Sequence, residues 1–173
     1  MDTFDTHSSQ CPAAAYLSHE AGSLAINGYR HWLLGLVERD ETAFGRVWSA
    51  HNAALGENLS RMAMEGLHGL VSQLENCGRC PMRFLRPKSM HLCREEGLVL
   101  GMIASIQNGH EAVTWRCATH LTCPRLAEQL IGAGGLYSMP LKAGGQTLLP
   151  FPSEIMGMFD QAQSEQAAGE TYH

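Results

Sequence analysis

Apolar side chains recur every three to four positions along most of this 173-residue sequence. The spacing predicts amphipathic helices, because an α-helix turns once in about 3.6 residues and brings such positions onto one face. Isoleucine and valine together number only ten and no strand-like alternation persists, which disfavours strands. We therefore predict an all-α fold, a single-domain helical bundle of about five to six helices. The clearest stripe consists of Leu59, Met62, Ala63, Gly66, Leu67, Leu70, Val71 and Leu74.

Capping residues and helix breakers predict where these helices begin and end. Asp40 and Ser89 carry side-chain oxygens that can accept the unpaired amides of a first turn, so we expect a helix after each. Asn108-Gly109 is typical of a helix end, and Pro124 is typical of a first helical turn. We expect the helix that starts there to end at Gly134-Gly135. The stripe of the helix after Ser89 contains Leu92, Glu96, Val99, Met102, Ile103 and Ile106.

Glycine and proline also divide the chain into regions. The segment 12–37 has helical spacing, and we expect it to be interrupted or bent at Gly22 or Gly28. From Met139 onward, prolines and glycines break regular structure. The predicted organisation is a flexible N-terminal tail at 1–10, a helical domain at 11–137 with a Cys-rich basic loop at 77–94, and an irregular C-terminal extension at 138–173 with room for one short helix at 153–163.

The charge balance and the absence of targeting patterns limit the class of protein. Twelve Lys and Arg against seventeen Asp and Glu give a net charge of -5, which disfavours attachment to nucleic acid or anionic lipid. The first ten residues lack a basic-then-apolar signal, and no apolar run of about eighteen residues occurs. We therefore expect a cytoplasmic protein that does not enter membranes and whose partner is another protein. In a reducing compartment, cysteines are more often thiols, metal ligands or redox groups than structural bridges.

Cysteines and basic residues are concentrated in one part of the chain. Five of the six cysteines lie between Cys77 and Cys123, and five of the twelve basic residues lie in the basic loop at 77–94. No acidic residue occurs between Glu75 and Glu95. Clustered thiolates carry negative charge, which nearby basic side chains stabilise. The residues expected to supply this charge, or to contact an anion or a partner, are Arg79, Arg83, Arg86, Lys88 and Arg94.

A helical hairpin about Asn108-Gly109 would bring distant cysteines together. Cys93 and Cys123 are nearly equidistant from this turn, so in an antiparallel pair they lie at the same height. Cys117 lies nearer the turn and is expected to be a core thiol. The helix before the basic loop ends at a Cys-Gly-Arg-Cys motif, and alternating helix directions bring that end close to the start of the next helix. The predicted metal ligands are therefore Cys77, Cys80, Cys93 and Cys123.

Four thiolates suit either a structural zinc ion or an iron-sulfur cluster, and the residues leave this choice open. Proline follows Cys80 and Cys123, as it follows a cysteine in the cluster-binding runs of bacterial ferredoxins, which favours iron and sulfur. His91, His120 and Cys117 are the substitute ligands if one thiol does not bind. The predicted function is that of a small accessory or regulatory protein, rather than an enzyme, whose metal centre joins the basic loop to the helical hairpin.

Three alternatives stand beside this prediction. Single cysteines in helices are more often packed in the core than bound to metal, and no second close pair follows Cys77-x2-Cys80. Cys77 and Cys80 could instead form a thiol-disulfide redox pair, although a pair that closes a helix lacks the favourable dipole of a helix N-terminus. The basic loop could bind an acidic partner or nucleic acid, and the net charge disfavours nucleic acid.

Overall fold

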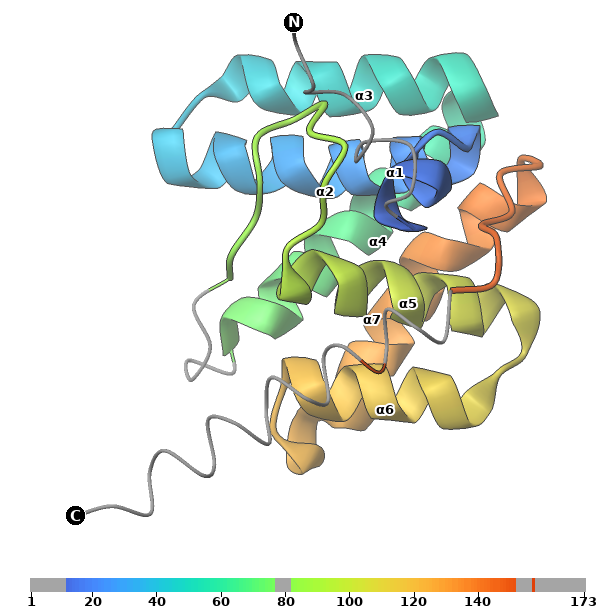
Figure 1. Cartoon of the computed structure of the whole chain (residues 1–173). Coiled ribbons are helices and arrows are strands. Elements are labelled where there is room, and N and C mark those ends of the chain that lie inside the picture. Colours follow the sequence, from blue (N-terminus) through green and yellow to red (C-terminus); the bar gives the residue numbers. More distant parts are fainter. Residues whose placement is uncertain (1–11, 77–81, 152–156, 158–173) are drawn as a thin grey trace, which may run out of the picture.

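The structure, a computed structural model, describes residues 12–76, 82–151 and 157. These residues form helices and no strand (Figure 1), so the all-α bundle predicted from the sequence is confirmed. The expected tail at 1–10 lies outside the described residues, as does the expected short helix at 153–163 apart from Gly157. The seven helices of the described part are α1 (Pro12–Leu17), α2 (Glu20–Glu38), α3 (Glu41–Leu55), α4 (Glu57–Asn76), α5 (Arg94–Asn108), α6 (Glu111–Leu121) and α7 (Pro124–Ala143).

Three predicted helix boundaries are confirmed. Asp40 precedes α3, and its Oδ1 accepts a hydrogen bond from the amide of Thr42 at 2.9 Å. Gly109 ends α5 in the left-handed conformation with φ of 73°, which glycine adopts without steric cost. Pro124 is the first residue of α7, where the missing amide hydrogen is not needed.

The N-terminal segment is divided at a different place from the one predicted. α1 and α2 are separated at Ser18 and His19, so the expected bend at Gly22 or Gly28 is wrong. Both glycines are packing positions inside α2. A Cβ atom on Gly28 would lie 2.7 Å from the ring of His51 on α3, and one on Gly22 would lie 3.0 Å from the carbonyl oxygen of Tyr16. A missing side chain here permits close contact between helices rather than a bend.

The most extensive helix contact joins α4 to α7, which run antiparallel (Figure 1). Gly66 of α4 lies against the backbone of Leu136 and Tyr137 in α7. Gly144, which follows α7, lies near Leu59 in the first turn of α4. The C-terminal end of α4 therefore meets the N-terminal end of α7.

α5 runs through the middle of the molecule, with every residue in the range 96–105 buried. α6 packs along one side of α5 and α7 along another, while α2 contacts it near its start (Figure 1). Such burial means that other parts of the protein cover α5 on every side, and not only along the apolar stripe predicted from its sequence. The core of the bundle is therefore built around α5.

α7 continues well past Gly134-Gly135, so the predicted end of the last helix is wrong. Gly134 faces α5, where a Cβ atom would lie 3.0 Å from Cε of Met102. Tyr137 is fully buried beyond these glycines, and its packing stabilises further turns even though Pro140 lies within the helix. The paired glycines therefore allow helix contact and do not stop the helix.

Residues 144–151 contain no helix or strand, and side chains from earlier helices hold them. The side-chain oxygen of Gln107 accepts a hydrogen bond from the amide of Leu148 at 2.7 Å, and the side chain of Asn108 donates to the carbonyl of Leu148 at 3.2 Å. The hydroxyl of Tyr16 donates to the carbonyl of Leu149 at 3.1 Å. Residues 138–143 belong to α7, so the predicted boundary at 138 is wrong and the irregular extension begins at 144. Its described start is attached to α1 and α5.

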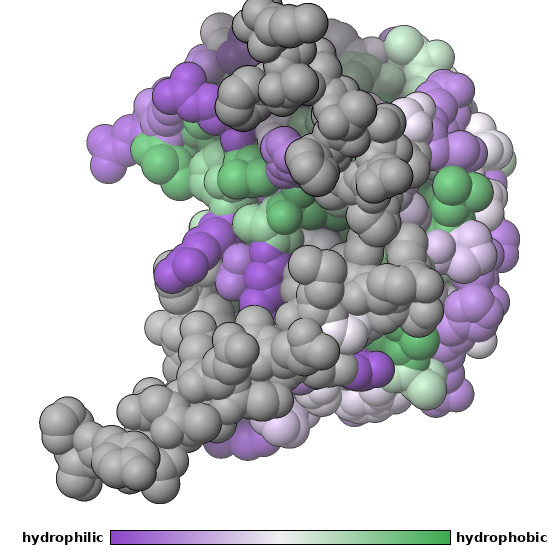
Figure 2. Space-filling view, viewed as in Figure 1, coloured by the Kyte–Doolittle hydropathy of each residue, from purple (hydrophilic) through white to green (hydrophobic). Residues whose placement is uncertain are grey.

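Several large apolar side chains of the described residues are exposed at the surface. Figure 2 shows apolar residues gathered at the left of the visible face, around a hollow below the turn between α2 and α3. Leu36 and Val37 in the last turn of α2 are both exposed. Among the described residues, no helix combines the length and the apolar character needed to cross a bilayer.

Candidate functional site

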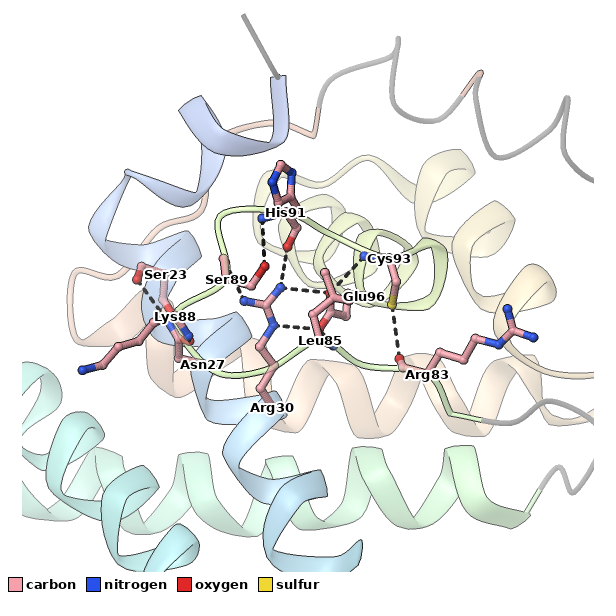
Figure 3. Close-up of polar contacts among 10 residues, drawn as sticks. All are labelled: Ser23, Asn27, Arg30, Arg83, Leu85, Lys88, Ser89, His91, Cys93 and Glu96. Atoms are coloured by element: carbon pink, nitrogen blue, oxygen red, sulfur yellow. Dashed lines mark hydrogen bonds and ion pairs between the residues drawn. The ribbon is translucent and has the colours of Figure 1, made fainter. Parts of the chain in front are cut away.

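The described part of the basic loop, residues 82–93, is attached to α2 by a buried ion pair (Figure 3). Arg30 of α2 and Glu96 of α5 both have side chains that are inaccessible to solvent. Nε of Arg30 donates to Oε1 of Glu96 at 2.7 Å, and Nη2 donates to Oε2 at 3.0 Å. This two-point geometry is the strongest form of an arginine-carboxylate contact.

The same ion pair satisfies backbone groups on both arms of the loop. The arginine also donates to the carbonyl oxygens of Ser89 at 2.8 Å and His91 at 2.6 Å. The glutamate accepts hydrogen bonds from the amides of Leu85 at 2.8 Å and Cys93 at 3.0 Å. Irregular backbone needs such partners, because an unpaired buried amide or carbonyl is costly. The ion pair therefore determines the path of the loop.

The loop contacts also determine where α5 begins. α5 starts at Arg94 with Cys93 as the residue before its first turn, so the predicted helix start after Ser89 is wrong. The carbonyls of Ser89 and His91 accept hydrogen bonds from the buried arginine instead of from helical amides. The carboxylate of Glu96, three positions after Cys93, accepts a hydrogen bond from the amide of Cys93, as in a capping box.

Cys93 is a half-buried thiol whose sulfur donates a hydrogen bond to the carbonyl of Arg83 at 3.3 Å (Figure 3). Burial, together with the carboxylates of Glu96 and Glu95, raises the pKa of the Cys93 thiol to about 12. The thiol is therefore protonated at neutral pH in this environment. The expectation of a basic surrounding needs correction here, because the two carboxylates at the start of α5 oppose the charge of the loop.

Cys123 and Cys117 occupy different environments. Cys123 is half-buried and precedes the first turn of α7, whereas Cys117 in α6 is fully buried, as expected for a core thiol. Burial raises the pKa of Cys117 to about 12. α5 and α6 run antiparallel, so the start of α5 and the end of α6 lie at one end of the bundle (Figure 1). Cys93 and Cys123 therefore share that end, which is also where α4 finishes at Asn76.

Cys77, Cys80 and Arg79 lie outside the described residues, so the four-thiol set remains a prediction. Across residues 12–76 and 82–151, no three His, Cys, Asp or Glu side chains are grouped so that they could hold a metal ion. A metal centre would therefore need at least one ligand from the rest of the chain or a rearrangement of the described ligands.

The substitute ligands are placed less favourably than Cys93. His91 is exposed, and its ring points away from Cys93 (Figure 3). His120 is half-buried in the last turn of α6. Among the basic residues, Arg83, Arg86 and Lys88 are exposed, and Arg94 lies 3.9 Å from the carboxylate of Glu95.

The sequence pattern did not reveal the ion pair that organises this region. Glu96 falls within the stripe predicted for the helix after Ser89, and Arg30 lies within the helical segment 12–37. A charged residue at a core position of a helix is itself a signal, because a buried charge needs a partner. The pattern contains two such charges on different predicted helices, but it does not show that they meet.

The fold and the loop geometry define an all-helical bundle with a docked basic loop. Comparisons of the chain with known protein families, curated proteins and solved structures found no match.

Proposed function

We propose that this is a small accessory or regulatory protein that carries a thiolate-ligated metal centre and acts together with another protein. The centre is either an iron-sulfur cluster or a structural zinc ion, with Cys77, Cys80, Cys93 and Cys123 as ligands. It joins the basic loop to the hairpin formed by α5 and α6.

The observation that carries the proposal is the shared position of three helix ends. α4 finishes at Asn76, one residue before Cys77, at the end of the bundle where Cys93 and Cys123 lie. Both of these thiols precede the first turn of a helix, where the unpaired amides favour negative charge. At Cys93 a bound metal would have to offset the burial and the two carboxylates that keep the free thiol protonated. The Cys93 thiol now donates a hydrogen bond to the carbonyl of Arg83 in the basic loop, so a metal bound to this sulfur would lie next to the loop.

Anaerobic purification followed by absorption spectroscopy and metal and sulfide analysis tests the proposal. We expect either brown protein with iron and sulfide or colourless protein with about one zinc ion per chain. Cys93→Ala and Cys123→Ala should each lose bound metal, because each removes a ligand. Cys117→Ala is the matched control and should retain it, because Cys117 is a buried core thiol of α6.

Two results would contradict the metal centre. Equal metal content in all three variants would show that Cys93 and Cys123 are not ligands. Metal-free protein with a reversibly oxidised dithiol at Cys77 and Cys80 would instead support the thiol-disulfide alternative.

A further inference from the structure

A cavity of about 510 Å³ lies between α2, α3 and the basic loop, away from the cysteine end of the bundle. Its volume is within the range of small-molecule sites. Asn27 and His31 line it from α2, Arg46 and Ala50 from α3, and Lys88 from the loop. Polar and basic groups from three separate elements therefore face one space.

The three basic side chains are close enough to influence one another. Burial lowers the pKa of His31, and the positive charges of Arg46 and Lys88 lower it further. Nδ1 of His31 is buried and has no hydrogen-bond partner among the described residues. His31 as a whole is only half-buried and lines the cavity, where the two neighbouring cations favour an anionic ligand.

A hydrogen bond from its amide holds the backbone of Lys88 against α2. Its amide donates to Oδ1 of Asn27 at 2.8 Å, and the side-chain nitrogen of Asn27 is in turn fixed by the carbonyl of Ser23 at 2.9 Å. Lys88 has φ of 67°, a left-handed conformation that is uncommon for residues other than glycine. In Figure 3 its side chain extends on the side of Asn27, away from the buried ion pair. The fixed backbone thus places Lys88 among the residues that line the cavity.

Two acidic residues limit which anion would fit. Nη2 of Arg46 lies 3.0 Å from Oδ2 of Asp40 and forms an ion pair with it, and both side chains are partly exposed. Glu20 also lines the cavity, and its Oε1 accepts a hydrogen bond from Gln146 at 3.3 Å. A ligand with strong negative charge at one end and hydroxyl groups at the other would match both kinds of side chain. The small side chain of Ala54, two turns along α3 from Arg46, leaves room for the uncharged part.

We propose that this cavity binds a small phosphate-bearing organic molecule, with the phosphate contacted by Lys88, His31 and Arg46 and the organic part over Ala54 toward Glu20. A phosphate dianion suits this set better than a single carboxylate, because three donors from three elements can each contact a different oxygen. The site is separate from the proposed metal centre and does not depend on it.

Calorimetric titration of the full-length protein at constant ionic strength tests the proposal, with inorganic phosphate and ribose 5-phosphate as probes. We expect saturable binding of both and tighter binding of ribose 5-phosphate. Lys88→Asn removes the charge, and asparagine tolerates left-handed backbone, so the loop keeps its shape. This variant should bind both probes about tenfold more weakly. The matched control is Arg83→Gln, which removes one exposed positive charge from the same loop outside the cavity and should bind normally.

The organic part is tested separately by Ala54→Leu, which fills the end of the cavity away from Arg46 and leaves every charge in place. This variant should bind ribose 5-phosphate more weakly and bind inorganic phosphate as the wild-type protein does. Absence of saturable binding of either probe up to about 10 mM would overturn the proposal. Equal weakening by Lys88→Asn and Arg83→Gln would also overturn it, because general attraction to the loop would then explain the binding. Unchanged binding of both probes by Ala54→Leu would show that the organic part does not bind in this cavity.

Discussion

A buried arginine and a buried carboxylate each cost several kcal/mol of desolvation, and only a nearly complete set of partners offsets that cost. Arg30 has such a set, since its hydrogen bonds reach one carboxylate and two loop carbonyls. Glu96 has a similar set, since it accepts from the arginine and from two loop amides. The consequence is specificity of position: another loop path would leave one of these charges unpaired in the interior.

Glu96→Gln should leave Arg30 charged in the interior without a counter-charge. We expect a loss of about 3 to 5 kcal/mol in the free energy of unfolding, measured by urea denaturation. Faster hydrogen exchange at the amides of Leu85 and Cys93 should accompany it, because both donate to this carboxylate. The control is Glu57→Gln, which breaks an exposed ion pair with Arg61 and should cost no more than about 0.5 kcal/mol. Similar losses for both variants would show that the buried pair has no special role.

At the scale of helices, glycines determine how closely the elements approach. Gly66 permits α4 to touch the backbone of α7, and Gly134 permits α7 to contact side chains of α5. Gly69, one turn after Gly66 in α4, has no neighbouring atom within 4 Å of an added Cβ. Two glycines of one helix therefore have opposite roles, and their sequence context does not distinguish them.

Gly66→Ala should separate α4 from α7, because the new Cβ would lie 2.5 Å from the carbonyl carbon of Leu136 and from the amide nitrogen of Tyr137. Backbone atoms cannot turn aside as a flexible side chain can. We expect a loss of about 2 to 3 kcal/mol in the free energy of unfolding. Gly69→Ala is the control and should be neutral or stabilising by up to about 1 kcal/mol, because alanine favours helix. Thermal and urea unfolding of both variants measure the difference, and a stable Gly66→Ala protein would contradict the close helix contact.

At the scale of the whole molecule, a buried histidine connects three helices. Nδ1 of His51 in α3 donates to the carbonyl of Val47 at 2.9 Å, and Nε2 accepts from the hydroxyl of Tyr137 in α7 at 3.0 Å. The same hydroxyl lies 3.4 Å from the carbonyl of Ala25 in α2. Burial lowers the pKa of His51, and its hydrogen bond to Val47 only partly opposes this effect. The neutral ring is therefore the form that fits the folded protein.

The fold should lose stability as the solution becomes acidic. The pKa of His51 in the folded protein lies below its ordinary value of 6.5, so the unfolded chain binds more protons than the folded one as the pH falls below about 6.5. His31 contributes with the same sign. We expect the free energy of unfolding to decrease between about pH 7 and pH 5, as measured by urea denaturation at a series of pH values.

His51→Gln should make this pH dependence shallower, because glutamine does not titrate. The matched control is His68→Gln, which replaces an exposed histidine of α4 and so accounts for the loss of one imidazole outside the core. An identical dependence in wild-type protein and His51→Gln would show that His51 does not couple protonation to folding.

Much of the fold could be predicted from local signals. The apolar stripe of 59–74 lies within α4, and Asp40, Gly109 and Pro124 bound helices as expected. The predictions that were wrong concern Ser89, Gly22, Gly28 and Gly134-Gly135. At Ser89, Gly28 and Gly134 a contact with a distant segment replaces the local preference, and at Gly22 a contact with the preceding helix α1 does so. The four predicted metal ligands remain a prediction, because two of them lie outside the described residues.

The sequence alone determined that the chain is helical, because periodic burial and end capping act over a few residues and need no knowledge of neighbours. Only the tertiary structure decided how the basic loop runs, because that path depends on Arg30 and Glu96 meeting across 66 positions. It also decided which glycines are contact points and which are not. Pairing of buried charges and close approach of backbones are properties of three-dimensional proximity, so no local pattern in the chain encodes them.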